Sequence, residues 1–83
     1  AGDFACERAV KRGGARLVLL DAAASGATQE RYFGMCERAG LPCFTVADLG
    51  RAIGKDGRMV AAVTDERFAQ MIRDAYASDK NAN

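Results

Sequence analysis

The stretch "ARLVLLD", residues 15–21, decides the fold of this chain. It is a short apolar run between turn signals, since Gly13 and Gly14 precede it and the small-residue segment "AAASGA" follows it. A run of this kind is typical of a strand covered on both faces, because the side chains on either face then meet apolar neighbours. We therefore expect helices on both sides of the sheet that contains it.

Two more strands and four helices are predicted around this strand. The strands are residues 41–47, "LPCFTVA", and residues 58–64, "RMVAAVT". Apolar spacing and glycine stops predict helices over residues 3–12, 28–39, 49–54 and 65–77. Hydroxyl and carboxylate side chains that could cap the later helices are Thr28, Asp48 and Thr64.

The alternation of helices and strands indicates a three-layer α/β/α sandwich with a small, mostly parallel or mixed central sheet. In a parallel sheet the carboxyl ends of the strands meet at one edge, where loops are free to bind ligands. We expect that edge to hold residues 21–28, Asp48 and Thr64, with the start of the first helix close to it.

Apolar residues at helical or strand spacing define the expected core. The sheet core is predicted to contain Leu17, Val18, Leu19, Phe44, Val46, Val60, Ala62 and Val63. The apolar stripes of the helices are predicted to contain some combination of Tyr32, Phe33, Met35, Cys36 and Ala39, together with Phe4, Cys6, Ala9, Val10, Leu49, Ala52, Ile53, Phe68, Met71, Ile72 and Tyr76.

Length and composition favour one small cytoplasmic domain. The chain has 83 residues, 49% of them hydrophobic, which is enough for one core and not for two. The predicted domain covers residues 1–78, and the polar residues 79–83 are predicted to form a disordered tail. No apolar run approaches the roughly 20 residues that a membrane-spanning helix needs, so no membrane partner is expected.

The residue types available to the chain disfavour catalysis and metal binding. Histidine, the commonest general base and metal ligand, is absent. Cys6, Cys36 and Cys43 are an odd number without a C-x-x-C spacing, which indicates buried thiols rather than a zinc site or disulfides. The chain also lacks a glycine-rich phosphate fingerprint after a strand, so we expect no cofactor, no metal and no enzyme activity.

Positive charge is unevenly distributed along the chain. The net charge is only +1, but residues 1–60 carry nine Lys and Arg residues against seven acidic ones. Residues 61–83 carry three basic residues against four acidic ones. Any surface for a polyanion is therefore expected in the first part of the chain.

Three stretches resemble one known protein family. They are "AVKRGGARLVLL", "ATQERYFGMCERAGLPC" and "LGRAIGKDGRMVAAVTDERFA", and the last is the most specific. Together they resemble the ribosomal-protein family whose archaeal and eukaryotic members bind RNA kink-turns, in particular its small bacterial YlxQ-type branch. The resemblance extends from Gly2 to Ile72. It implies an α/β/α fold and a non-catalytic RNA-binding protein of ribosome-linked or translation-linked RNA metabolism.

Family members grip RNA with three neighbouring pieces, which correspond here to residues 2–8, 22–28 and 55–59. The resemblance therefore implies an RNA-binding set of Gly2, Asp3, Phe4, Arg8, Ser25, Thr28, Lys55, Gly57, Arg58 and Met59. Glycine permits close backbone approach, and Arg and Lys supply charge-assisted contacts to phosphates and base edges. The implied partner is structured RNA, either a kink-turn or ribosomal RNA, with the ribosome or translation factors as further partners and no DNA.

The chain departs from the family pattern in two places. Strong kink-turn binders carry an Asn-Glu pair that reads sheared G·A pairs, and those positions are Phe4 and Ala5 here. The family also has an N-terminal helix and a first strand before the position of Gly2, so we expect either a fragment or an open sheet edge.

Other interpretations of the same residues stay open. Arg8, Lys11 and Arg12 are also what the solvated face of a helix requires, and Lys55 and Arg58 suit an ordinary solvent turn. At the level of function, the alternatives are a protein-interaction module that has lost the RNA code and an RNA-recruiting domain of an RNA-modifying enzyme. Salt-dependent binding to kink-turn RNA distinguishes the first alternative from RNA recognition.

Overall fold

A three-stranded mixed sheet lies at the centre of the computed structural model, which describes residues 2–55 and 57–82. The strands are β1 (Leu17–Asp21), β2 (Cys43–Val46) and β3 (Val60–Val63), in the spatial order β2-β1-β3. The helices of this part of the chain are α1 (Gly2–Lys11), α2 (Gly26–Ala39), α3 (Leu49–Ile53) and α4 (Glu66–Ala82).

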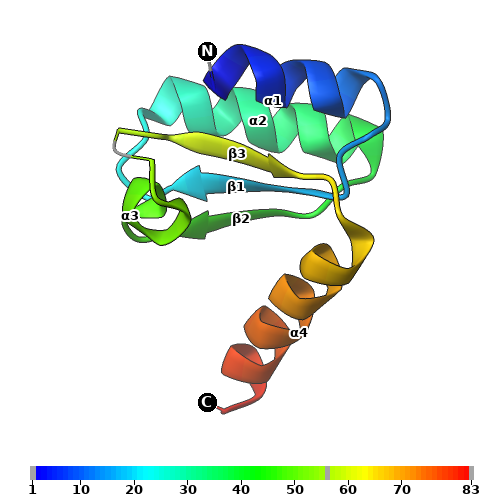
Figure 1. Cartoon of the computed structure of the whole chain (residues 1–83), viewed down its shortest axis with the longest axis vertical. Coiled ribbons are helices and arrows are strands. Elements are labelled where there is room, and N and C mark those ends of the chain that lie inside the picture. Colours follow the sequence, from blue (N-terminus) through cyan, green and yellow to red (C-terminus); the bar gives the residue numbers. More distant parts are fainter. Residues whose placement is uncertain (1, 56, 83) are drawn as a thin grey trace.

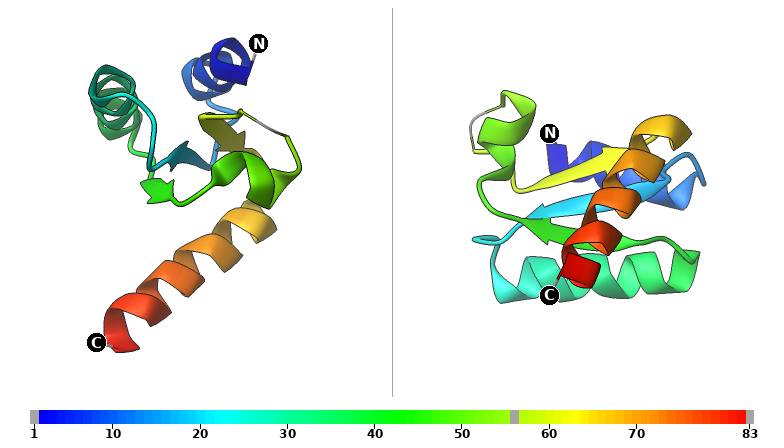
Figure 2. Two further views of the ribbon diagram at one scale, coloured as in Figure 1. Left: turned by 90° about the vertical axis from the view of Figure 1, so that its left-hand side faces the viewer. Right: turned by 90° about the horizontal axis from the view of Figure 1, so that it is seen from below.

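Helices cover both faces of the sheet, as the buried β1 run predicts. Figure 1 shows α1 and α2 side by side on one face, with α3 and α4 on the other. The left-hand view of Figure 2 separates the same three layers. All five residues of β1 are buried. The predicted α/β/α architecture is therefore confirmed, with a mixed sheet.

The direction of β3 differs from that of the other strands. β1 pairs with β2 in parallel, with Leu19 opposite Phe44, but it pairs with β3 antiparallel, with Leu19 opposite Ala61. The expectation that Thr64 shares an edge with Asp21 is therefore wrong. Thr64 follows the far end of β3, and it is the start of β3 that meets the end of β1.

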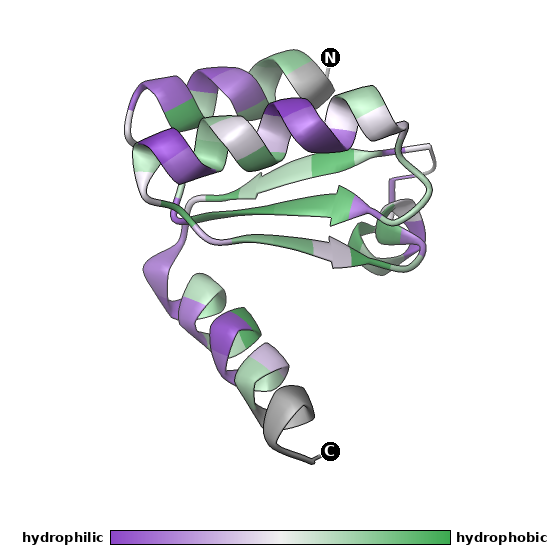
Figure 3. Cartoon of the chain, turned by 180° about the vertical axis from the view of Figure 1, so that it is seen from behind, coloured by the Kyte–Doolittle hydropathy of each residue, from purple (hydrophilic) through white to green (hydrophobic). Residues whose placement is uncertain are grey.

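Alternate residues of the strands build two separate apolar clusters. Against α1 and α2 lie Val18, Leu20 and Val60, packed with Cys6, Val10, Tyr32, Met35 and Cys36. Against α3 and α4 lie Leu17, Leu19 and Val63, packed with Leu49 and Ala69. Figure 3 shows the apolar strands lying between helices that carry polar outer faces. Each predicted sheet residue lies in or against one of these clusters.

Several residues predicted for the helix stripes are exposed instead. They are Phe4, Phe33, Ala39, Ala52, Phe68 and Met71. Each of these residues lies on a helix whose buried stripe is narrower than predicted. The other apolar residues of that helix cover the sheet without it. In α4, for example, Ala69 is fully buried, while Phe68 beside it is 51% exposed.

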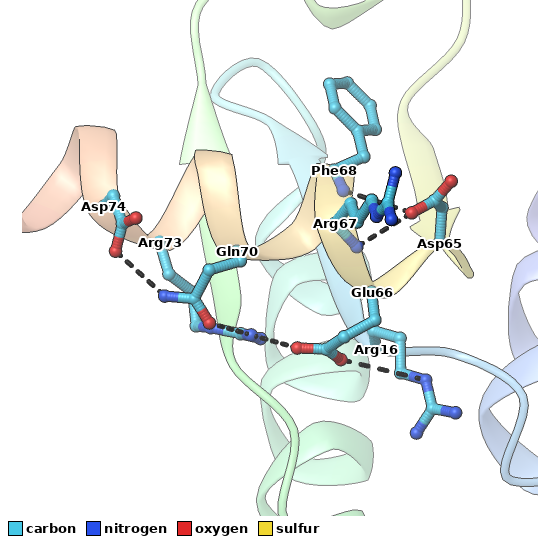
Figure 4. A network of polar contacts seen from close by, with 8 residues as sticks. All are labelled: Arg16, Asp65, Glu66, Arg67, Phe68, Gln70, Arg73 and Asp74. Carbon is cyan, nitrogen blue, oxygen red and sulfur yellow. Dashed lines mark hydrogen bonds and ion pairs between the residues drawn. The ribbon is translucent and has the colours of Figure 1, made fainter.

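Helix capping also differs from the prediction at three positions. Ser25 rather than Thr28 caps α2, since the Thr28 N–H donates to Ser25 Oγ over 3.1 Å. Asp65 rather than Thr64 caps α4, where its Oδ1 accepts from the N–H groups of Arg67 and Phe68, at 2.8 and 3.2 Å (Figure 4). Asp48 precedes α3 as predicted, but its side chain makes no capping hydrogen bond.

The last helix, α4, contacts the rest of the molecule through Glu66 at its start and Tyr76 near its middle. Near its start, Glu66 lies 3.9 Å from the Arg16 guanidinium and 2.6 Å from that of Arg73 (Figure 4). Further along, the Tyr76 ring stacks on Phe44 at 4.4 Å, and its hydroxyl donates to the Thr45 carbonyl oxygen over 3.0 Å. The helix α4 extends through Ala82, beyond the predicted helix end at residue 77, and Asn83 lies outside the described residues. Among the described residues, no helix is long and apolar enough to cross a membrane.

Candidate nucleic-acid interface

Two of the three predicted RNA-binding pieces meet at one edge of the sheet. Residues 22–25 leave the end of β1, and residues 55–59 lead into the start of β3. Because β3 is antiparallel, these segments are neighbours, and the Asp21 N–H donates to the Met59 carbonyl oxygen over 2.8 Å. The end of β2 lies at the same place, since the Ala22 N–H donates to the Val46 carbonyl oxygen over 2.8 Å.

The loop of residues 22–25 is held by its own hydrogen bonds. The Gln29 amide donates to the Ala24 carbonyl oxygen over 2.9 Å, and Ser25 Oγ donates to Thr28 Oγ1 over 3.0 Å. The predicted RNA contacts Ser25 and Thr28 therefore have their hydroxyls engaged in starting α2. Ala22 and Ala23, by contrast, are exposed. Small exposed side chains leave the backbone of this loop accessible to a bulky partner.

The basic loop, by which we mean Lys55, Gly57 and Arg58, folds back onto α3. The Lys55 N–H donates to the Gly50 carbonyl oxygen over 2.7 Å, and Gly57 takes a positive φ of 75°. Gly50 is buried beneath this loop, and a side chain there would collide with the Lys55 carbonyl oxygen. The predicted contacts Lys55, Gly57 and Met59 are exposed and Arg58 is half-buried, while Asp56 lies outside the described residues.

The exposed side of α1 carries the remaining predicted contacts. The Arg8 guanidinium lies over the Phe4 ring, 5.7 Å from its centroid, and Phe4 is 71% exposed. Gly2 and Asp3 begin the helix, but their side-chain surroundings lie outside what is described. Phe4 therefore belongs to the surface and not to the core stripe.

Lys11 is engaged elsewhere. Its ammonium lies 2.9 Å from Glu7, which also accepts from Arg31 of α2 over 2.9 Å. The hydrogen bond from Lys11 lowers the pKa of the Glu7 carboxyl, and its charge and Arg31 add to this. Among the described residues Arg8, Lys55 and Arg58 have no such ion-pair partner. Their charge is available to a polyanion.

Arg58 connects the basic loop to α1. It lines a shallow groove together with Ala5 and Ala9 of that helix. Arg8 follows Ala5 by three residues and lies on the adjoining flank of α1, since residues three apart are neighbours on a helix. Three of the predicted cations thus come from segments that adjoin one another around Arg58.

The predicted RNA-binding set omits two residues of these segments, although Asp21 itself is among the residues expected at this edge. Arg51 is exposed on α3, and the L-G-R run that contains it is the sequence feature that could have indicated it. Asp21 is buried, and its signal is a lone carboxylate at the end of an otherwise apolar strand. Neither residue belongs to the predicted set.

The three thiols lie together on the side of the sheet that α1 and α2 cover. Cys6 and Cys36 are buried between α1, α2 and the sheet, and Cys43 packs against them. Burial, together with the neighbouring thiols, raises the pKa of Cys43 to about 12. Within residues 2–55 and 57–82 there is no group of three side chains suited to hold a metal ion.

Comparison with solved structures shows which known proteins share this fold. It has the fold of a 15.5kD RNA binding protein from Giardia lamblia, with a TM-score of 0.72 and 23% identity over 98% of this chain and 72% of that one. A protein of unknown function from Bacillus halodurans C superposes with a TM-score of 0.81 and 32% identity, over 88% and 77% of the two chains. No family model matches.

A curated relative supplies the family. The RNA-binding protein YlxQ of Bacillus subtilis (strain 168) is 36% identical over 75 residues, which cover 87% of this chain and 75% of YlxQ. The chain therefore belongs to the YlxQ family.

Proposed function

We propose that this protein is a small, non-catalytic RNA-binding protein that recognises structured, kink-turn-like RNA in ribosome-linked or translation-linked metabolism. The observation that carries the proposal is the meeting of the loop 22–25, the basic loop and the α1 flank at one edge. Arg8, Lys55 and Arg58 have no ion-pair partner among the described residues there. The name of the relative from Bacillus subtilis supports RNA as the partner.

The binding is proposed to depend mainly on shape and phosphate contacts. The positions that carry Asn and Glu in strong kink-turn binders are Phe4 and Ala5, which offer no side-chain hydrogen bonds to base edges. Cations at the edge attract phosphates of any sequence, and the exposed Met59 and Phe4 can pack against an unstacked base. We propose Gly2, Asp3, Ser25, Thr28 and Gly57 as further contacts made close to the backbone.

The test compares RNAs of different shape at several salt concentrations. Fluorescence anisotropy with a labelled kink-turn, a plain duplex of the same length and a single strand gives three affinities. The proposal predicts the highest affinity for the kink-turn and a steep fall with salt for all three RNAs. Equal, weak and salt-independent binding to the three would contradict it.

A second candidate function, a protein-interaction module of the same fold, has one observation in its favour. An apolar groove of about 540 Å³ lies between α4 and the sheet, lined by Leu49, Ile53, Phe68 and Ile72 among others. Lys55 and Arg58 also line this groove. If the RNA test fails, this groove becomes the better candidate for a binding surface.

A further inference from the structure

Asp21 is a buried charge in an apolar strand. It is 6% exposed and is the only buried polar or charged side chain among the described residues. No described Lys or Arg forms an ion pair with it. Burial of a carboxylate is costly unless hydrogen bonds compensate, so an apolar residue would serve the strand better. The carboxylate therefore needs a reason other than core packing.

The two carboxylate oxygens bind two different segments. Oδ1 accepts from the Ala23 N–H over 2.7 Å, within the loop 22–25. Oδ2 accepts from the Leu49 N–H over 2.9 Å, at the first residue of α3 and 28 residues further along the chain. A single side chain thus fixes the loop and the helix relative to each other.

The backbone of Asp21 extends the connection to a third segment. Its N–H donates to the Met59 carbonyl oxygen over 2.8 Å, and its carbonyl oxygen accepts from the Ala24 N–H over 2.9 Å. Asp21 consequently contacts the loop 22–25, the start of α3 and the end of the segment that holds the basic loop.

The position of α3 sets the position of the basic loop. Asp48 supplies no side-chain cap to α3, so the start of this helix is held at the sheet by the hydrogen bond from the Leu49 N–H to Asp21 and by the burial of the Leu49 side chain against Leu17 and Leu19. The next residue, Gly50, lies directly beneath the Lys55 carbonyl oxygen and the Gly57 N–H. A displacement of Leu49 would therefore carry Lys55 and Arg58 with it.

We propose that Asp21 is a positioning residue, which fixes the spacing between the loop 22–25 and the basic loop so that both contact one RNA at the same time. The inference rests on the proposed RNA-binding function. The role requires two acceptor oxygens on one side chain, because the N–H groups of Ala23 and Leu49 belong to different segments and are bound at the same time. In Asp21→Asn the amide NH₂ group faces one of these donors, and one of the two hydrogen bonds is lost.

The test asks whether Asp21 controls the contribution of the basic loop. The slope of log affinity against log salt is measured for the parent, Lys55→Ala, Asp21→Asn and the double variant. In the parent background, Lys55→Ala should make the negative slope shallower by roughly one. In the Asp21→Asn background, the same change should make it shallower by less than half as much, since a displaced loop has less contact to lose.

A matched control separates positioning from stability. Asp65→Ala removes the cap of α4 at the opposite end of the sheet, so it should lower the melting temperature without changing the effect of Lys55→Ala. Amide exchange gives a second readout, in which Asp21→Asn should lose protection at Leu49 or Ala23 while Leu19 in the core stays protected. If Asp21→Asn does not fold, Asp21→Glu, which keeps both acceptors on a longer side chain, takes its place in the same measurements.

The outcomes distinguish the two proposals. If the parent binds RNA and Lys55→Ala has its full effect in the Asp21 variant, the positioning role is refuted and the RNA function stands. If the parent shows no salt-dependent RNA binding, both proposals fall.

Discussion

A Cβ atom on Gly50 would lie 2.6 Å from the carbonyl oxygen of Lys55. The same atom would lie 3.1 Å from the Gly57 nitrogen, so the collision is with backbone that cannot rotate away. The glycine of the L-G-R run is thus the surface on which the basic loop rests. This contact connects a sequence motif to the geometry of the candidate interface.

Gly50→Ala should destabilise the protein and displace the basic loop. Overpacking against backbone typically costs about 1–3 kcal/mol in unfolding free energy. The expected result is a lower urea midpoint together with weaker RNA binding. Gly34→Ala in α2 is the matched control, because its nearest contact is the end of the Arg38 side chain at 3.4 Å, and alanine favours a helix. The account is contradicted if Gly50→Ala is as stable as Gly34→Ala.

Restoring the family pair should raise RNA specificity. Phe4→Asn with Ala5→Glu introduces hydrogen-bonding groups at the α1 start, and base-edge contacts of this kind are each worth about 1–3 kcal/mol by analogy with DNA readout. The preference for a kink-turn over a plain duplex should therefore increase, as measured by anisotropy. Since Phe4 is 71% exposed, its replacement opens no cavity, and the melting temperature should change little.

The control for this pair is Phe4→Ser with Ala5→Ser, which removes the same ring from Arg8 without supplying the family's side chains. An equal rise in preference in both double variants would show that loss of the ring, rather than the new contacts, is responsible.

Asp48 should tolerate glycine better than alanine. It has φ 55° and ψ 57°, and it is the only non-glycine residue of the described chain with positive φ. Its exposed side chain caps nothing, so only the backbone conformation decides the effect. Asp48→Gly should be neutral or stabilising by up to about 1 kcal/mol, while Asp48→Ala should cost about 1 kcal/mol. Thermal unfolding of the two variants tests the order, and the reverse order would contradict the strained conformation.

The half-buried thiol of Cys43 should make the folded protein less stable at alkaline pH. Its pKa is raised to about 12 in the folded state, chiefly by burial, from an ordinary value of 9.0. As the pH rises above 9, the unfolded chain loses a proton that the folded chain keeps, so stability falls with pH in this window. Urea unfolding at pH 8 and pH 10.5 measures the fall, which should be smaller in Cys43→Val. An equal fall in both proteins would show that Cys43 does not contribute.

Much of the fold was predictable from local sequence signals. The apolar run of β1 and the glycines after α1, α2 and α3 predict all seven elements in the observed order. The antiparallel direction of β3 was not predicted, because helical connections were read as full crossovers. The five residues of α3 extend only about 7 Å, too short to carry the chain back to the end of the sheet where β2 begins, so β3 runs in the opposite direction. The shortness of the predicted helix "LGRAIG" is the sequence feature that indicates the antiparallel direction of β3.

The candidate site was only partly predictable. Exposed cations in glycine-rich turns could be identified from the sequence, and the structure places Lys55, Gly57 and Met59 on the surface. Phe4 was assigned to the apolar face because helical periodicity tolerates it there, while α1 in fact buries only a narrow stripe around Cys6 and Val10. The link from Asp21 to Leu49 depends on two segments that meet only after folding, so no local pattern could reveal it.

The central claim is that the basic loop binds RNA phosphates at this edge, and the salt dependence of binding tests it most directly. Kink-turn and duplex affinities are measured at several salt concentrations for the parent, Lys55→Ala, Arg58→Ala and the control Arg38→Ala, whose side chain lies in the last turn of α2. We predict that Lys55→Ala and Arg58→Ala each weaken binding to both RNAs alike and reduce the magnitude of the negative log–log slope by roughly one, while Arg38→Ala changes neither the affinity nor the slope. Slopes that are the same for all four proteins would contradict the account.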